Sequence, residues 1–169
     1  LQTQALSMAM SQASSMFDVH VRLMRQLERD GALDRTIEFL PGEDEIVERR
    51  AEGRGLTSPE IRVPMAYVKI ELFKDLMESG IAADEYLTDA LVDYFPGPLR
   101  ERYRPLMREH RLAAEIISTI VTNEVVNRAG STYCFRLREE TGASIADICR
   151  AYIVAREVFA MPELWHRVE

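Results

Sequence analysis

Lysine and cysteine are both scarce in this sequence, and each shortage narrows the chemistry that the chain can perform. Lys69 and Lys74 are the only lysines among 21 basic residues, so few amines are present for nucleophilic or Schiff-base catalysis. Cys134 and Cys149 are the only cysteines, and their separation excludes the CxxC pairs of redox and zinc sites. Both lie in apolar helical stretches, so we expect buried free thiols, as is typical of proteins in a reducing cytosol.

Long apolar runs and an excess of positive charge are also absent. No apolar run approaches the roughly 18 residues of a membrane span, and residues 1–17 lack the basic and apolar regions of a signal peptide. The net charge of -7 repels phosphate backbones and anionic lipids. We therefore expect a cytoplasmic protein that binds neither nucleic acid nor membranes. Because the sequence does not begin with Met, we also expect that its first residue is a cut inside a longer chain.

Motifs that carry catalysis or bind cofactors are missing as well. None of the three histidines has a His, Cys or carboxylate partner at the spacing of metal ligands. They are His20, His110 and His166. Gly53 and Gly55 form a GxG, but Ser58 occupies the third glycine position of a dinucleotide fingerprint and no strand is predicted before it. We therefore expect no catalytic, cofactor-binding or metal-binding residue in this chain.

Helical periodicity dominates what is present. Hydrophobic residues make up 47% and charged residues 29% of the 169 residues, a balance typical of a globular domain. Apolar residues recur at spacings of three, four and seven, which predicts helices over 1–29, 57–79 and 105–129. Runs with the period-two alternation of strands are absent. We predict an all-α fold, an irregular bundle of antiparallel helix hairpins without a sheet.

Cap and stop signals agree with this periodicity. Thr57 and Glu60 have the spacing of a capping box at the start of the 57–79 helix. Ser144 has N-cap character for the last main helix. Gly31 and Gly130 follow the ends of the 1–29 and 105–129 helices, where a left-handed residue commonly stops a helix.

A charge-dense segment separates the first helices from the rest of the chain. Residues 43–55 are rich in charge and finish in EGRG, so we expect a hinge or linker there. The predicted domains are an N-terminal helical segment with this linker, 1–55, and a C-terminal helical domain, 56–169. The first of these is expected to connect to a region upstream.

Polar residues interrupt the apolar face near the end of the predicted 105–129 helix. Leu106 and Ile117 lie on one side of that helix, and Glu124 projects on the same stripe. The polar cluster comprises Asn123, Glu124, Asn127 and Arg128. One interpretation is a helix end that emerges into solvent with a Glu124–Arg128 ion pair. The other is a satisfied polar network that holds another domain or subunit, which makes the cluster a candidate interface.

Several long blocks resemble a known family. The chain is similar to the C-terminal helical region of the large bacterial NAD-specific glutamate dehydrogenases. The blocks include LTSPEIRVPMAYVKIELFKDLM, HRLAAEIISTIVTNEVVNRAGSTYCFRL and EETGASIADICRAYIVAREVF, in the order expected of that family. DVHVRLMRQLERDGALDRTIEFLP resembles the segment that precedes them. Pro64 departs from the pattern, because an apolar helix former is expected there, and this puts the straightness of its helix in doubt.

The resemblance implies a helical, non-catalytic part of an oxidoreductase of amino-acid metabolism. The family deaminates L-glutamate oxidatively to 2-oxoglutarate and ammonia while NAD is reduced. It carries its dinucleotide fold and substrate lysines upstream, so the resemblance implies NAD in the parent enzyme and no cofactor in this fragment. We interpret Lys69 and Lys74 as solvated helix lysines. The implied partners are the catalytic core of the same polypeptide and, in a homo-oligomer, further copies of the parent.

Two other classes of function compete with this interpretation. One is a stand-alone helical adaptor or regulatory domain, against which the absent initiator Met argues. The other is a helix-turn-helix reader of nucleic acid built on residues 142–157. A recognition helix there would have to present polar and basic residues to the groove. Ile153, Val154 and Phe159 make that surface apolar instead, and the net charge also disfavours this reading.

Overall fold

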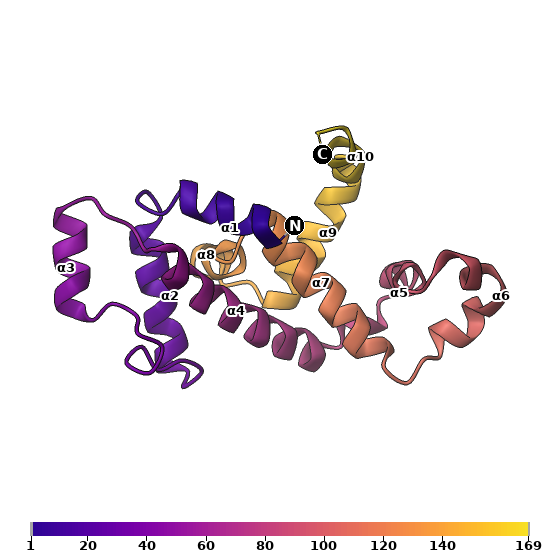
Figure 1. The fold of residues 1–169 in the computed structure, drawn as a ribbon. Helices are drawn as coiled ribbons and strands as arrows, with labels where there is room; N and C mark the ends of the chain where they lie inside the picture. Colours follow the sequence, from indigo (N-terminus) through magenta and orange to yellow (C-terminus); the bar gives the residue numbers. More distant parts are fainter. Residues whose placement is uncertain (1, 169) are drawn as a thin grey trace. The chain divides into compact units, whose positions relative to one another are not determined.

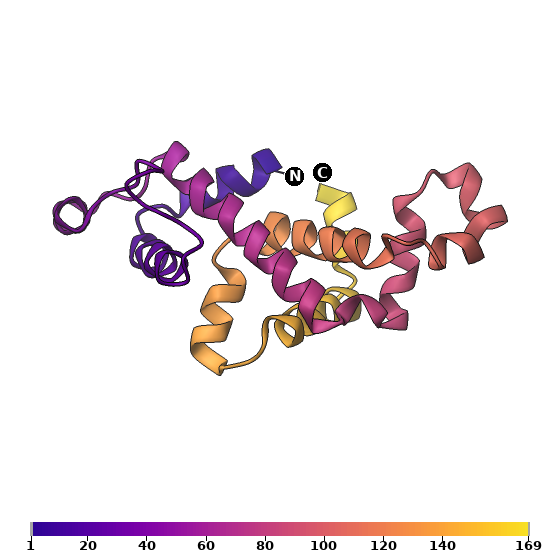
Figure 2. The ribbon, with the colours of Figure 1, turned by 90° about the horizontal axis from the view of Figure 1, so that it is seen from below.

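The computed structural model describes residues 2–168, and helices make up its regular structure (Figure 1 and Figure 2). Within this range there is no β-strand, so the all-α class predicted from the periodicity is confirmed. The helices are α1 (Gln2–Ser11), α2 (Phe17–Arg29), α3 (Glu43–Ala51), α4 (Ser58–Ser79), α5 (Thr88–Tyr94), α6 (Gly97–Arg108), α7 (Ala113–Ala129), α8 (Tyr133–Thr141), α9 (Ile145–Val158) and α10 (Met161–Val168). Two 3₁₀ turns, η1 (Ile81–Ala83) and η2 (Glu85–Leu87), lie between α4 and α5 in the sequence.

The helices form two compact units. The first unit contains the residues up to Lys74 together with Thr122–Arg136, and the second contains Asp75–Val121 together with the residues from Leu137 onward. The predicted division into 1–55 and 56–169 concerns how the chain is organised within a longer protein and stays a prediction. Residues 43–55, expected to be a linker, contain α3, whose Ile46 is fully buried in the core of the first unit.

One face of α2 forms the centre of the first unit. Phe17, Val21 and Met24 follow one another at spacings of four and three, and none is more than 3% exposed. Ile46 of α3 and Ile61 of α4 belong to the same buried cluster. Full burial of each such side chain contributes about 1.5–3 kcal/mol to stability. The views in Figure 1 and Figure 2 agree that α2 and α3 lie side by side with aligned axes.

The first helix predicted from the sequence, 1–29, is broken in the structure. Residues 12–16 form a turn between α1 and α2, so the prediction of one continuous helix is wrong. Gly55 explains the position of the break. A Cβ at residue 55 would overlap the backbone of Ala13 and Ser14, which shows that the turn lies directly against Gly55. This approach is a tertiary contact, and local helical propensity carries no sign of it.

The start of α4 follows the predicted capping box. The backbone N–H of Thr57 donates to Oε2 of Glu60 at 2.7 Å, and the N–H of Ile61 donates to the carbonyl of Thr57 at 2.9 Å. Pro64 lies inside α4 and is buried. It removes one backbone donor from the helix, but the helix continues to Ser79 without interruption. The packing of its neighbours therefore outweighs the missing hydrogen bond.

The predicted helix over 105–129 is also divided. In the second unit, α6 ends at Arg108, and α7 begins only at Ala113. His110 lies in the intervening turn, where its Nδ1 accepts a hydrogen bond from the N–H of Leu112 at 3.2 Å and its ring meets Phe95 edge to face. The prediction of one continuous helix over 105–129 is therefore wrong, and His110 lies at the break. A side chain that satisfies a backbone donor locally competes with the helical bond.

Cap and stop residues elsewhere confirm the local predictions. Gly31, Gly130 and Gly142 have left-handed backbone conformations with φ of 73°, 97° and 70°. They follow α2, α7 and α8, as expected of glycines at helix C-termini. The hydroxyl of Ser144 accepts from the N–H of Asp147 at 3.1 Å, which is the predicted N-cap of α9. Local signals of this kind can be predicted from the sequence because they act over three or four residues.

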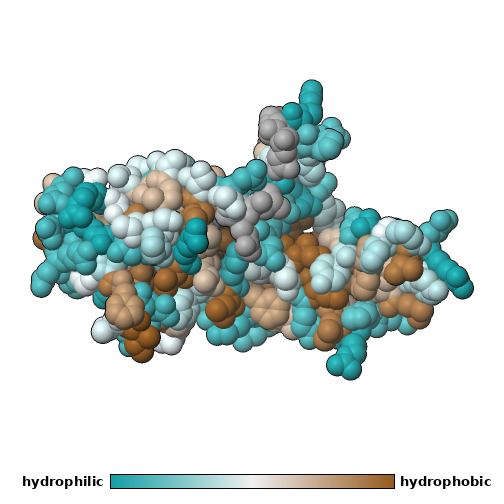
Figure 3. Space-filling view, viewed as in Figure 1, coloured by the Kyte–Doolittle hydropathy of each residue, from teal (hydrophilic) through white to brown (hydrophobic). Residues whose placement is uncertain are grey.

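The surface of the first unit differs between α3 and the loop that precedes it. Figure 3 shows mainly hydrophilic residues over α3 and a hydrophobic patch over the α2–α3 loop. In that loop, Ile37 is 70% and Phe39 is 90% exposed. Phe39 also has a positive φ of 54°, a conformation that costs a non-glycine residue roughly 1–2 kcal/mol. The loop therefore presents apolar side chains on a backbone held by the structure around it.

Candidate functional site

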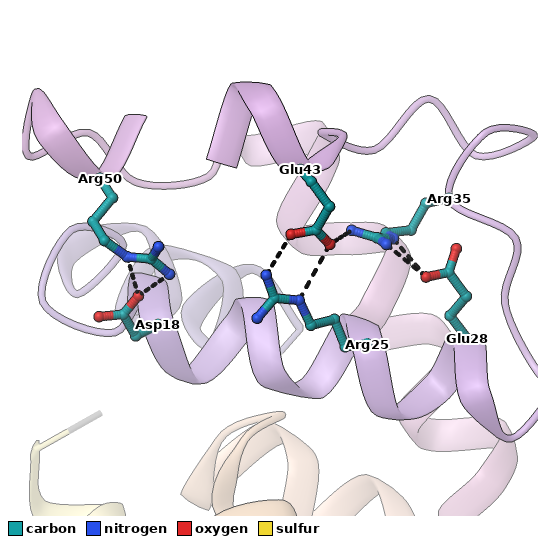
Figure 4. A network of polar contacts seen from close by, with 6 residues as sticks. All are labelled: Asp18, Arg25, Glu28, Arg35, Glu43 and Arg50. Atoms are coloured by element: carbon teal, nitrogen blue, oxygen red, sulfur yellow. Dashed lines mark hydrogen bonds and ion pairs between the residues drawn. The ribbon is translucent and has the colours of Figure 1, made fainter. Parts of the chain in front are cut away.

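An ion-pair network connects α2, the following loop and α3 in the first unit (Figure 4). Glu43 accepts hydrogen bonds from Arg25 and from Nη1 of Arg35, the latter at 2.9 Å. Arg35 also pairs with Glu28 at 2.7 Å. Hydrogen bonds from Arg25 and then from Arg35 lower the pKa of Glu43 to about 2. Because the side chain of Glu43 is 52% exposed, solvent screens these charges and each pair stabilises the fold only modestly.

A buried ion pair lies beside this network. Nη1 and Nη2 of Arg49 donate to the two carboxylate oxygens of Glu60 at 2.7 and 2.8 Å, and Glu45 accepts a further hydrogen bond from Arg49. The side chains of Arg49 and Glu60 are 8% and 14% exposed. Burial alone would raise the pKa of Glu60, but the bonds from Arg49 and Thr57 outweigh it and lower that pKa to about 2. The pair fixes α3 to the start of α4.

The asparagines of the predicted polar cluster meet a lysine. Nζ of Lys69, on α4, donates to Oδ1 of Asn123 at 2.8 Å and to Oδ1 of Asn127 at 3.0 Å, both on α7 and in the same unit. Lys69 is partly buried, and this burial lowers its pKa. The interpretation of Lys69 as a solvated helix lysine is therefore wrong. Lys74 does fit that interpretation, because it is exposed and pairs with Glu71 at 2.8 Å.

All four residues of the predicted cluster lie on the last turns of α7 and are partly buried. Glu124 and Arg128 take part in further polar contacts of their own. The structure thus brings Asn123 and Asn127 together on a cation that the sequence pattern did not connect with them. A signal for Lys69 was present. Its helical neighbours at four residues before and three after are Met65 and Leu72, which places the lysine at the edge of an apolar face.

A structural role fits the surroundings of His20, the two cysteines and the GxG glycines better than a chemical one. His20 is 3% exposed, its Nδ1 has no hydrogen-bond partner in the structure, and burial lowers its pKa. Cys134 and Cys149 form no disulfide and are buried, as predicted. Gly53, two residues after the end of α3, has a φ of 65°, and Gly55 lies against the backbone of another segment. In residues 2–168, no three His, Cys, Asp or Glu side chains are grouped as a metal site would require.

Comparison with known families identifies the region to which these helices correspond. The family described as "Glutamate dehydrogenase, C-terminal" matches residues 53–169. The chain belongs to this family. Its helices α4 to α10 fall within the match, and therefore so do Lys69 and the whole polar cluster of α7.

Individual relatives extend the similarity to nearly the whole chain. The NAD-specific glutamate dehydrogenase of Pseudomonas aeruginosa is 43% identical over 168 residues, and that of Halomonas elongata is 40% identical over 168 residues. The enzyme of the same name from Mycobacterium tuberculosis is 34% identical over 167 residues. Each alignment covers 99% of this chain but only 10% of the relative. The chain thus spans about one tenth of the length of these relatives.

Among the described residues of this family member, no helix has both the length and the apolar character needed to cross a bilayer.

Proposed function

We propose that this chain is the C-terminal helical domain of an NAD-specific glutamate dehydrogenase, where it supports the catalytic part and performs no chemistry itself. The observation that carries the proposal is the coverage: the relatives match 99% of the chain, and the chain matches 10% of each relative. The parent protein would deaminate L-glutamate oxidatively to 2-oxoglutarate and ammonia in the cytoplasm. NAD and the substrate would bind in the other nine tenths.

The surroundings of Lys69 and Lys74 agree with a non-catalytic role for this chain. Amino-acid dehydrogenation needs groups that hold the substrate carboxylates and a fold that holds the dinucleotide. Lys69 is engaged by the amide oxygens of Asn123 and Asn127, whereas Lys74 pairs with Glu71 at the surface. The two amines therefore serve different parts of α4 and do not form a common substrate site.

The end of α7 is the proposed contact with the catalytic part of the same polypeptide. Asn123 and Asn127 use their Oδ1 atoms on Lys69, and each also carries an amide NH₂ that an ammonium group cannot engage. Those donors suit backbone carbonyls of a partner. Arg128 adds a planar guanidinium that binds carboxylates or carbonyls with defined geometry. The same surface would serve a neighbouring subunit if the parent is a homo-oligomer.

Substitutions at the end of α7 in the full-length enzyme test this proposal. Asn127→Ala and Arg128→Ala should weaken assembly or turnover, because removal of one partner from a satisfied buried contact costs about 1–3 kcal/mol. Sedimentation and NADH formation from glutamate are the measurements. Thr119→Ala, an exposed position on the same helix, is the matched control and should leave both unchanged. Unaltered assembly and turnover in all three variants would exclude this surface as the contact.

A second experiment tests where the cofactor binds. Titration of NAD into the 1–169 chain should produce no saturable heat, whereas the full-length enzyme should bind NAD in the same buffer. Saturable binding by the 1–169 chain at micromolar concentration would contradict the supporting role. Far-UV circular dichroism of the same sample shows whether the chain is folded and helical when it is titrated.

A further inference from the structure

Two cations on α4, Arg62 and Lys69, have no carboxylate partner among the residues that the structure describes. Five arginines of this unit each form an ion pair, namely Arg25, Arg35, Arg49, Arg50 and Arg54. Arg62 and Lys69 are different. Within residues 2–168, no carboxylate lies at ion-pair distance from either of them. They are seven residues apart, which places both on the same face of the helix.

Both cations line one hollow between α1 and α4. The hollow has a volume of about 320 Å³, and its walls are Thr3, Leu6, Arg62, Met65, Ala66 and Lys69. Thr3 and Leu6 belong to α1, whereas the other residues are consecutive positions of one α4 face. All six residues belong to the first unit. Two cations and a hydroxyl therefore line the same depression as three apolar side chains.

Lys69 is held in place by neutral groups. Of the three N–H donors of its ammonium group, two engage Asn123 and Asn127. Amide oxygens orient the ammonium, but they do not cancel its charge. The desolvation that lowers the pKa of Lys69 is thus not offset by an opposite charge. An anion in the hollow would supply that charge and accept the third hydrogen.

We propose that this hollow binds a small organic anion through a carboxylate or phosphate group. Arg62 would hold the anion with its planar fork, and Lys69 would bind it as a point charge. Thr3 adds a hydroxyl donor, while Leu6, Met65 and Ala66 contact a short apolar part of the ligand. A volume near 300 Å³ is at the lower end of small-molecule sites. This site goes beyond the proposed function, which places the substrates of the enzyme outside this chain.

Hydrogen–deuterium exchange of the full-length enzyme tests the site locally. The probes are inorganic phosphate and succinate, each compared with sodium chloride at equal ionic strength because salt screens exposed charges. Peptides from α1 and from the first turns of α4 should exchange more slowly with at least one probe. Protection by phosphate alone would assign the ligand to the phosphate class, and protection by succinate alone would assign it to the carboxylate class.

Variants separate the site from general effects of anions. Arg62 is exposed, so Arg62→Gln should leave the fold intact and remove the protection, with affinity reduced roughly tenfold or more. Arg62→Lys should retain part of it. Lys74→Gln, on the same helix but outside the hollow, is the matched control and should behave like the parent protein.

Three results would overturn the proposal. The first is the absence of anion-dependent protection of α1 and α4 in the unsubstituted enzyme. The second is equal protection in Arg62→Gln. The third is a loss of assembly in Arg62→Gln without any effect of the probes, because the hollow would then hold an acidic side chain of the larger protein. The readout uses neither turnover nor the α7 contact, so it can fail or succeed independently of the proposed function.

Discussion

The α2–α3 network and the Lys69 site lie in the same unit and use charge in opposite ways. Around Glu43, each guanidinium group meets a carboxylate, and around Arg49 the same holds in a buried setting. Lys69 instead has two neutral acceptors. In the first arrangement, carboxylates balance the charges of the guanidinium groups. The second leaves a positive charge in a partly buried position, which is the arrangement expected of a site that meets something else.

The largest expected effect comes from removing Arg49, the buried cation of the α3–α4 ion pair. Arg49→Ala should destabilise the 1–169 chain by about 3–5 kcal/mol, because the carboxylate of Glu60 remains buried without its partner. Urea unfolding measures the change. Arg54→Ala removes an exposed ion pair with Glu52 and is the matched control, with an expected effect within about 1 kcal/mol. If both substitutions lower the free energy of unfolding equally, the Arg49–Glu60 pair stabilises the chain no more than an exposed pair.

Protonation of Glu60 should break its ion pair with Arg49 in a defined pH range. The pKa of Glu60 is lowered to about 2 from an ordinary value of 4.5. A carboxyl whose pKa is depressed on folding stabilises the fold above its unfolded pKa, and this stability is lost as the pH falls toward the folded pKa. The unfolding free energies of the parent chain and Glu60→Gln should therefore differ by about 2–3 kcal/mol at neutral pH and converge between pH 4.5 and 2. A difference that is constant over this range would contradict the assignment.

A backbone contact that positions α1, and with it one wall of the hollow, can be tested separately. Gly55→Ala should destabilise the chain by about 1–3 kcal/mol, because a Cβ there overlaps the backbone of residues 13 and 14. Gly42→Ala is the matched control, since no heavy atom lies within 4 Å of its added Cβ. Thermal unfolding followed by circular dichroism compares the two. The contact is refuted if both variants unfold at the temperature of the parent chain.

The smallest expected effect concerns Lys69, whose neighbours Asn123 and Asn127 are neutral. Lys69→Met should change the free energy of unfolding by no more than about 1 kcal/mol, because the lost amide contacts are offset by the removal of a desolvated charge. Arg49→Met should lower the free energy of unfolding several times more, because it leaves the Glu60 carboxylate buried without its partner. Urea unfolding of both variants at neutral pH decides. If Lys69→Met is as destabilising as Arg49→Met, the ammonium group belongs to the stabilising framework and the contrast between the two regions disappears.

The polar cluster shows how far sequence reasoning reaches at a site. The inversion of the pattern near the end of the predicted 105–129 helix placed Glu124 on the apolar stripe and grouped Asn123 and Asn127 with it, and the structure shows both asparagines bonded to Lys69. The pattern could not name Lys69 as their partner, because 54 residues separate it from Asn123. A contact between two helices depends on how those helices pack, and a single helical period carries no information about the packing.

The sequence by itself determined the all-α class and the local ends of its helices. The Thr57–Glu60 cap, the Ser144 cap and the glycine stops all act over a few residues, so their signals are complete in the local sequence. Only the tertiary structure decided the break at 12–16 and the partners of Arg49 and Lys69. These depend on groups that come together only after the helices pack. There, burial and close approach outweigh helical propensities of less than about 1 kcal/mol per residue.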